Sequence, residues 1–355
     1  MENMDIRELL QIAVENKASD LHLLEGACPT LRVDGVLIPL IEKGRLTNEM
    51  IETMVWQIVN PEQKEIILTN LELDFSFEFE KKVRFRVNAY RQHGSMAASL
   101  RLIPYQIKGI DELGLPKICH SFAQLKQGFI LVTGPTGQGK STTIAAVLNE
   151  INQKRAEHIV TVEDPIEFVM PSGKSLVSQR EIHQDTHSWD ISLRSVLRED
   201  PNVVLVGEMR DYETISSALT IAETGHLVFS TLHTNSAAQT IDRIVDVFPE
   251  NSKSQIRTQL SSTLEAVFSQ RLLPGISGGR VLACEIMVAT PAIKTAIREG
   301  KTHLIDNIIQ TSRELGMVPL ETNLAMLVKE GRISLEVAQE YALQPETLMR
   351  QIYSK

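Results

Sequence analysis

The segment that most constrains the fold of this chain is Gly-Pro-Thr-Gly-Gln-Gly-Lys-Ser, which occupies residues 134–141. Spaced glycines followed by Lys and Ser are the pattern of a phosphate-binding loop. The apolar run 129–133 predicts a strand before the loop, and apolar residues at helical spacing over 141–152 predict a helix after it. A Gly-rich turn that matched the pattern by chance would not need a strand before it and a helix after it. The sequence therefore predicts a site for a nucleoside triphosphate.

Each residue type in this loop has a physical role in holding phosphate. Glycines let backbone N–H groups turn inward around the phosphates, and the helix N-terminus adds partial positive charge. Lys140 is expected to neutralise the β and γ oxygens, and Ser141 to ligate magnesium. The predicted nucleotide contacts are Gly134, Pro135, Thr136, Gly137, Gln138, Gly139, Lys140, Ser141 and Thr142.

Length and composition bound the class of protein. A chain of 355 residues suggests about two domains, and 43% hydrophobic residues suffice for extended cores. No apolar run approaches the roughly 18 residues that span a bilayer, and residues 1–10 do not resemble a signal peptide, so we expect a cytoplasmic protein. The net charge of −9 weighs against broad contact with DNA, and no nucleic-acid partner is expected.

Residues 1–103 are predicted to form a small α+β domain. Apolar residues at helical spacing indicate a helix near its start, and Asp34-Gly35 between two β-prone runs predicts a hairpin. The stretch 104–116 contains Pro and Gly and few periodic apolar residues, which is typical of a linker. The domain boundary is therefore predicted there.

Two predicted strands of this domain have one apolar and one polar face. Phe alternates with polar residues over 75–79, and Val and Phe alternate with Arg and Asn over 83–88. Alternate side chains of a strand face opposite sides, so Arg84 and Arg86 should project together, with Arg101 on a third strand. Such arginines can assist phosphoryl transfer in another domain or subunit, but a solvated basic sheet face explains them equally well.

From residue 117 to 290 predicted strands and helices alternate. Beyond the strand before the loop, apolar strands are predicted at 158–162, 203–206, 227–232 and 280–288. This alternation predicts an α/β fold with a parallel sheet flanked by helices. The remaining residues, 291–355, have helical patterns throughout.

Carboxylates follow two of these strands. Glu208 comes soon after one, and Glu163 and Asp164 come directly after another. Ligands of open α/β sheets bind at the carboxyl ends of the strands, so Glu208 is predicted to hold magnesium or orient water, and the acidic pair to act as a base or orient a metal. The alternatives are a solvated turn for Glu208, and a helix cap or salt bridge for the pair.

Two histidines bracket the predicted strand 227–232. His233 follows its carboxyl end, which predicts a position near a γ-phosphate, and His226 precedes it. A histidine beside an apolar strand is often a structural group, so both interpretations stay open.

Four segments, in this order, resemble the motifs of the motor ATPases of type IV pili and type II secretion. Residues 134–143 resemble the Walker A box, 162–168 the Asp box, 207–211 the Walker B box and 223–235 the His box. Residues 296–303, Ala-Ile-Arg-Glu-Gly-Lys-Thr-His, resemble a region linked with retraction in the retraction ATPases of this family. The resemblance spans nearly the whole chain.

The resemblance implies a PAS-like N-terminal domain, a RecA-like ATPase domain with a helical C-terminal region, and assembly into a homohexameric ring. It implies ATP and Mg between the two domains, with Glu208 as catalytic glutamate, Glu163 positioning the attacking water and N-terminal arginines clamping the phosphates. Magnesium is then expected on Ser141 and Glu208, directly or through water. Gln138 stands where the family more often has Ser, but only the backbone is expected to matter there.

The resemblance also implies partners. The ring would turn an inner-membrane platform protein of the pilus and would be recruited peripherally to the inner membrane at the pilus base. An accessory retraction ATPase is a further candidate partner, and whether the ring requires one stays open. Assembly ATPases of the family carry a tetracysteine motif and a longer N-terminus, which this sequence lacks, so retraction is favoured over extension.

Two other functions share the same core. One is a RecA-like translocase acting on nucleic acid, against which the acidic charge balance argues. The other is a poorly hydrolysing accessory paralogue in a mixed ring. The presence of Lys140, Glu163 and Glu208 argues against that alternative.

Overall fold

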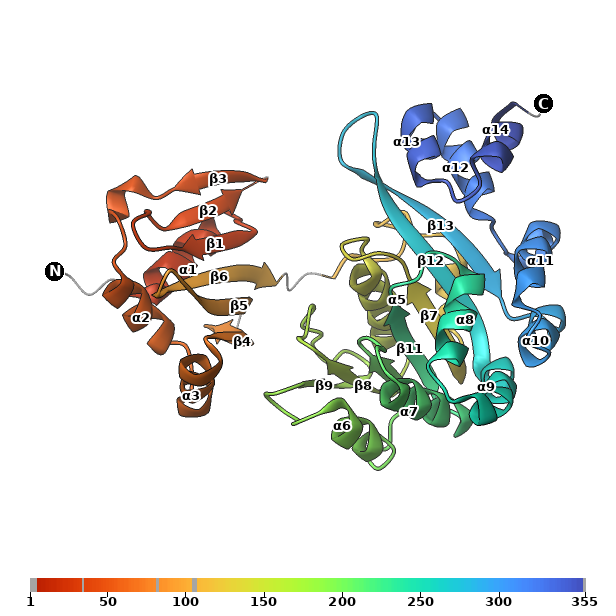
Figure 1. The fold of residues 1–355 in the computed structure, drawn as a ribbon, viewed down its shortest axis with the longest axis horizontal. Helices are drawn as coiled ribbons and strands as arrows, with labels where there is room; N and C mark the ends of the chain where they lie inside the picture. Colours follow the sequence, from red (N-terminus) through yellow and green to blue (C-terminus); the bar gives the residue numbers. More distant parts are fainter. Residues whose placement is uncertain (1–4, 34, 81–82, 104–106, 354–355) are drawn as a thin grey trace. The chain divides into compact units, whose positions relative to one another are not determined.

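The structure, a computed structural model, divides into two compact units (Figure 1). It describes residues 5–33, 35–80, 83–103 and 107–353. The first unit comprises Met1–Gln106 with Pro165–Val169, and the second comprises Ile107–Asp164 with Met170–Lys355. Asp34 of the predicted hairpin turn and residues 104–106 of the predicted linker lie outside the described residues.

The first unit is built on an antiparallel six-stranded sheet of order β3-β2-β1-β6-β5-β4. Its strands are β1 (Asp20–Leu23), β2 (Thr30–Val33), β3 (Val36–Pro39), β4 (Glu72–Phe79), β5 (Val83–Gln92) and β6 (Ser95–Ile103). Its helices are α1 (Ile6–Glu15), α2 (Asn48–Trp56) and α3 (Pro61–Asn70), with a 3-10 turn at Ile41–Lys43. The predicted hairpin is confirmed by the pairing of β2 with β3.

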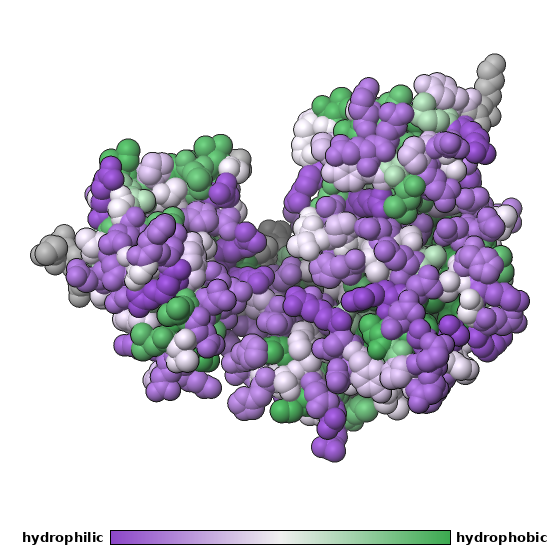
Figure 2. All heavy atoms as spheres, viewed as in Figure 1, coloured by the Kyte–Doolittle hydropathy of each residue, from purple (hydrophilic) through white to green (hydrophobic). Residues whose placement is uncertain are grey.

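Side-chain packing explains why the helices of this unit lie on its sheet. Helix α1 buries Ile6, Leu9, Leu10 and Ala13. Strand β5 buries Phe85 and Val87 on the same core, and Arg84 and Arg86 alternate with them. The predicted two-faced strand is thus confirmed. On the surface turned to the viewer in Figure 2 hydrophilic residues dominate, and apolar side chains gather over the edge strand β3.

The second unit contains a seven-stranded sheet of order β13-β12-β7-β11-β10-β8-β9. All neighbours are parallel except β12 and β13. The strands are β7 (Gly128–Thr133), β8 (His158–Glu163), β9 (Leu176–Glu181), β10 (Val203–Val206), β11 (Leu227–Leu232), β12 (Leu264–Pro274) and β13 (Arg280–Val288). The five strands predicted from residue 117 onwards are confirmed, whereas β9 and β12 were not predicted.

Helices cover both faces of this sheet (Figure 1). They are α4 (Ile118–Phe122), α5 (Lys140–Lys154), α6 (Trp189–Val196), α7 (Tyr212–Glu223), α8 (Ala237–Asp246) and α9 (Glu250–Thr263). In β7, Phe129 and Leu131 pack with α6 to α9, and Ile130 and Val132 pack with α4 and α5. Because alternate side chains of a strand face opposite sides, central strands buried on both faces have continuous apolar sequences.

The C-terminal region is helical, as predicted. It contains α10 (Pro291–Arg298), α11 (Ile305–Thr311), α12 (Leu320–Lys329), α13 (Leu335–Tyr341) and α14 (Pro345–Tyr353), with 3-10 turns at Thr302–Leu304 and Arg313–Leu315. An α+β unit, an α/β unit and C-terminal helices together confirm the predicted fold class. Within the described part of the chain, none of the helices has the length and apolar character needed to cross a bilayer.

Candidate active site

The predicted phosphate loop connects β7 to the first turn of α5. Gly134, Gly137 and Gly139 have φ of 140°, 78° and 80°, which side chains disfavour. A Cβ at Gly134 would also lie only 2.3 Å from the carbonyl oxygen of Gln270. The tight path of the loop therefore depends on glycine, as a cradle of inward-facing backbone N–H groups requires.

Lys140 is the first residue of α5 and is buried. Its Nζ donates hydrogen bonds to the carbonyl oxygens of Gly134 at 2.8 Å and Pro135 at 3.0 Å. A buried ammonium needs such acceptors to offset its lost hydration. The positive charge is thereby held against the loop, while Ser141 and Thr142 are half-buried in the following turn.

Three of the predicted site residues meet at the carboxyl edge of the sheet. The Glu208 Oε2 lies 3.6 Å from the His233 Nε2, and the other ring nitrogen of His233 lies 3.3 Å from the Thr136 Oγ1. The Glu208 Oε1 also accepts from the Arg210 guanidinium at 2.6 Å. Because β7, β11 and β10 are parallel neighbours, their carboxyl ends lie side by side, and His233 connects the phosphate loop to Glu208.

Glu163 ends β8, the strand next to β10, and is buried. Its Oε1 accepts hydrogen bonds from the Thr161 hydroxyl at 2.6 Å and the Gln179 amide at 3.2 Å. A Cβ at Gly207 would lie 3.6 Å from the Glu163 Cγ, so Glu163 borders the residue before Glu208. Two carboxylates from adjacent strands thus share one edge of the sheet, and Asp164, the next residue, is exposed.

His226 lies elsewhere. It precedes β11, and its Nδ1 lies 3.0 Å from both the Ile221 carbonyl oxygen and the Thr224 hydroxyl at the end of α7. The six residues of β11 separate it from His233 by roughly 20 Å, at about 3.3 Å per residue. The structure therefore does not bring His226 together with the loop.

The three predicted arginines belong to the first unit. Arg86 and Arg101 are directly opposite in the β5–β6 register, and Arg84 lies two positions from Arg86 on the same face. Arg101 pairs with Asp20 at 2.9 Å, and the Arg86 guanidinium lies 3.7 Å from the Asp74 carboxylate. They form a basic sheet face balanced by acids, and their contact with phosphate stays a prediction.

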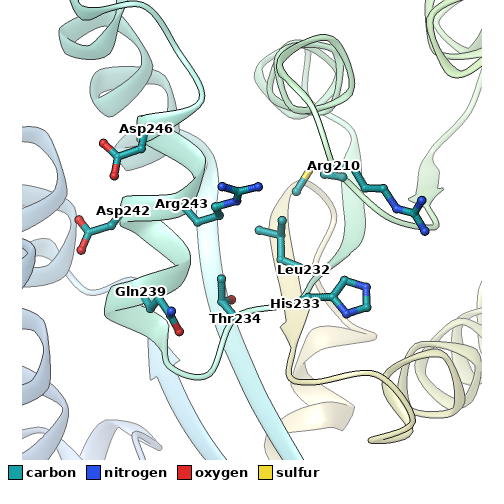
Figure 3. A pocket seen from close by; sticks show the side chains of 9 residues that line it. Arg210, Leu232, His233, Thr234, Gln239, Asp242, Arg243 and Asp246 are labelled. Atoms are coloured by element: carbon teal, nitrogen blue, oxygen red, sulfur yellow. The ribbon is translucent and has the colours of Figure 1, made fainter.

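A cavity of about 670 Å³ adjoins the His233 side of the site. Figure 3 shows Arg243 extending from α8 toward the strand end that carries Leu232 and His233, whereas Asp242 and Asp246 point to the other side of the helix. The cavity is lined by Met209, Arg210, Leu232, His233, Thr234, Gln239, Asp242, Arg243 and Asp246.

A buried carboxylate behind the site was missed in the sequence. Glu285 of β13 accepts a hydrogen bond at 2.6 Å from the backbone N–H of Ala237, which begins α8 directly after the His233 segment. Burial, with smaller contributions from Asp306 and Glu321, raises the pKa of Glu285 to about 7 from an ordinary 4.5. A glutamate within an apolar strand gives no sequence signal of its burial.

Glu285 should make stability depend on pH. Because the pKa of Glu285 is raised in the folded state, its contribution to the free energy of unfolding is fully present below about pH 4.5. That contribution is lost as the pH rises through about 7. Glu285→Gln keeps an acceptor for the Ala237 N–H without the charge. At about pH 8 we expect this variant to be more stable than wild type by roughly 3 kcal/mol, with little difference near pH 4.5. Denaturant unfolding at both pH values measures this, and an equal difference at both would contradict it.

Comparisons with known proteins find similarity over nearly the whole chain. The profile of the family described as "Type II/IV secretion system protein" matches residues 2–340. The "Type IV pilus retractation ATPase PilT" of Pseudomonas aeruginosa is 50% identical over 97% of this chain and 99% of its own length. The "Twitching motility protein" of Neisseria gonorrhoeae is 49% identical over 90% of this chain and 86% of its own length.

A solved structure is similar over the same extent. The crystal structure titled "Pilus Retraction Motor PilT and Bound ADP" superposes with a TM-score of 0.91 and is 45% identical, covering 98% of this chain and 99% of that one. The similarity therefore includes both units and the C-terminal helices.

Proposed function

Because this chain belongs to the family of type II/IV secretion system proteins, we propose that it is a motor ATPase that hydrolyses ATP to power type IV pilus retraction. The observation that carries the proposal is the contact of one histidine with both the phosphate loop and a carboxylate. His233 lies 3.3 Å from the Thr136 hydroxyl and 3.6 Å from Glu208. Through His233, a change in the phosphates bound at the loop would alter the position of the Glu208 carboxylate.

The loop residues fit a triphosphate. Its glycines have backbone angles that other residues rarely adopt, and its lysine is buried against loop carbonyls. Lys140 and the first turn of α5 would hold the phosphates, and Ser141 and Glu208 would hold Mg²⁺ directly or through water. Mg²⁺, when bound, neutralises phosphate charge and so favours attack on the γ-phosphorus.

The two carboxylates take different roles in the proposed reaction. Glu208 acts as the catalytic glutamate, and Glu163, held by Thr161 and Gln179, positions the attacking water. Arg84, Arg86 and Arg101 supply positive charge to the phosphates from the N-terminal sheet. Positioning of the water and neutralisation of the phosphate charge together supply most of the catalysis available to phosphoryl transfer.

The proposed motor is a homohexameric ring. Closure of one domain against another in each subunit would turn a platform protein of the inner membrane, which recruits the ring peripherally to the pilus base. An accessory retraction ATPase is a further candidate partner. A nucleic-acid translocase would share the ATPase core, but a net charge of −9 does not suit a phosphate backbone.

The proposal is tested in the organism that carries the gene. The gene is deleted and restored as wild type or as Glu208→Ala, surface pili are counted, and single fibres are followed by light microscopy. We expect the deletion strain to carry excess pili that never shorten, with rescue by wild type only.

Two results would contradict retraction. Loss of pili on deletion would indicate an assembly ATPase. Unchanged pilus number and unchanged shortening would indicate secretion or nucleic-acid transport.

A further inference from the structure

One edge of β12 faces the phosphate loop. β12 pairs with β7 only as far as Ser269 opposite Thr133, whereas its pairing with β13 continues to Pro274. Beyond Thr133, β7 gives way to the loop. Since successive backbone groups of a strand point alternately to its two sides, and the Gln270 carbonyl lies against Gly134, the backbone groups of Gln270 and Leu272 both face the loop.

The side chain of Gln138 occupies this edge. Its Oε1 accepts a hydrogen bond from the Leu272 N–H at 2.5 Å, and the Gln270 Nε2 donates to the Gln138 carbonyl oxygen at 2.6 Å. The same loop residue is therefore held at its side chain and at its backbone. At the next position, a Cβ on Gly139 would lie 3.2 Å from the Leu272 Cδ1. The tip of the loop thus rests on residues 270–272.

The side chain of Gln270 is buried at an energetic cost, which indicates that it too holds the loop. The residue is 1% exposed, and its Oε1 is buried with no hydrogen-bond partner among the residues that the structure describes. An unpaired buried amide oxygen is unfavourable, and an apolar side chain of similar size would avoid it. What the amide contributes in return is the donor that reaches the Gln138 carbonyl.

We propose that Gln138 is a positioning residue whose side chain, together with Gln270, fixes the phosphate loop on β12 in its nucleotide-binding shape. The inference rests on the proposed nucleotide hydrolysis. A loop that is already in the bound shape loses less conformational freedom when nucleotide binds, and binding is correspondingly tighter. The inference gives the side chain a role at a position where the sequence-based expectation assigned one to the backbone alone.

The test replaces Gln138 with methionine, which has similar length but cannot accept the Leu272 hydrogen bond. We expect the Kd for ADP and the KM for ATP to rise by about three- to tenfold, with kcat within about twofold of wild type. The thermal midpoint without nucleotide should stay nearly unchanged. Gln124→Met, an exposed glutamine of the same unit, makes the same chemical change away from the loop and should bind ADP like wild type.

Gln270→Met and the double variant examine the other half of the contact. Because Gln138 and Gln270 hold the same part of the loop, the Kd of the double variant for ADP should be about equal to that of the single variant with the lower ADP affinity. Should Gln138→Met fold poorly, Gln138→Ser supplies the same readout, since its short side chain does not extend to Leu272.

The inference is overturned if Gln138→Met leaves both the Kd for ADP and the KM for ATP unchanged. It is also overturned if both single variants lose ADP affinity and show a matching fall in the thermal midpoint. The wild-type titration separates this from the larger proposal. A wild-type protein that binds no ADP would contradict the proposed function and, with it, the positioning role of Gln138.

Discussion

Replacing Glu208 with alanine is expected to lower the ATP turnover number by about 10²- to 10⁴-fold while nucleotide affinity stays within about threefold of wild type. The Glu208 carboxylate contacts Arg210 and His233, whereas the Lys140 ammonium contacts loop carbonyls. In the proposed reaction the loss of Glu208 removes the catalytic carboxylate and leaves the hydrogen bonds between Lys140 and the loop carbonyls in place. Steady-state hydrolysis measures turnover, and calorimetric titration with ADP measures affinity.

Two variants serve as controls for Glu208→Ala. Glu208→Gln keeps the size of the side chain and removes its charge, so it should lose turnover to a similar degree if the carboxylate is what catalysis needs. Glu340→Ala removes an exposed carboxylate on α13 and should hydrolyse ATP at the wild-type rate. An ADP affinity reduced in Glu208→Ala as much as turnover would refute the catalytic role.

The parallel strands of the second unit were predictable because of where they are buried. β7, β10 and β11 are covered on both faces, so their sequences are mostly apolar, with buried Ser230 and Thr231 in β11. β12 has no glycine or other turn signal at its start. It begins at Leu264, directly after α9 ends at Thr263, with no Gly or Pro between them. A strand that follows a helix without a turn signal cannot be separated from it by periodicity.

The main residues of the candidate site were predictable by one topological rule. Ligands of an open α/β sheet bind at the carboxyl ends of its strands, and Glu163, Glu208 and His233 each lie at or just beyond such an end. His226 lies at the opposite end of its strand, where it contacts the end of α7. The distinction between the two histidines follows from strand direction.

Gln138 shows where sequence reasoning stops. Its side chain is held by Leu272, which is 134 residues further along the chain. The partner lies on β12, the strand whose existence and register were not predicted. No local pattern encodes a hydrogen bond of that kind, so a role for this side chain required the three-dimensional structure.

Lys140→Ala should fail differently from Glu208→Ala, by losing tight nucleotide binding. The Lys140 ammonium is a buried cation held by the Gly134 and Pro135 carbonyls. Charge-assisted hydrogen bonds to phosphate are strong where water is excluded, so we expect the Kd for ADP to rise by at least about a hundredfold. The same calorimetric titration measures the change.

The two Lys140 hydrogen bonds within the loop make a structural control necessary. If alanine merely loosened the loop, the thermal midpoint without nucleotide would fall and affinity would fall with it. Lys154→Ala removes an exposed lysine from the last turn of the same helix, and should leave both quantities near wild type. ADP binding retained in Lys140→Ala would exclude the phosphate role of the ammonium. Binding lost there but kept in Glu208→Ala would assign the two charges to separate steps, one to holding the nucleotide and the other to its hydrolysis.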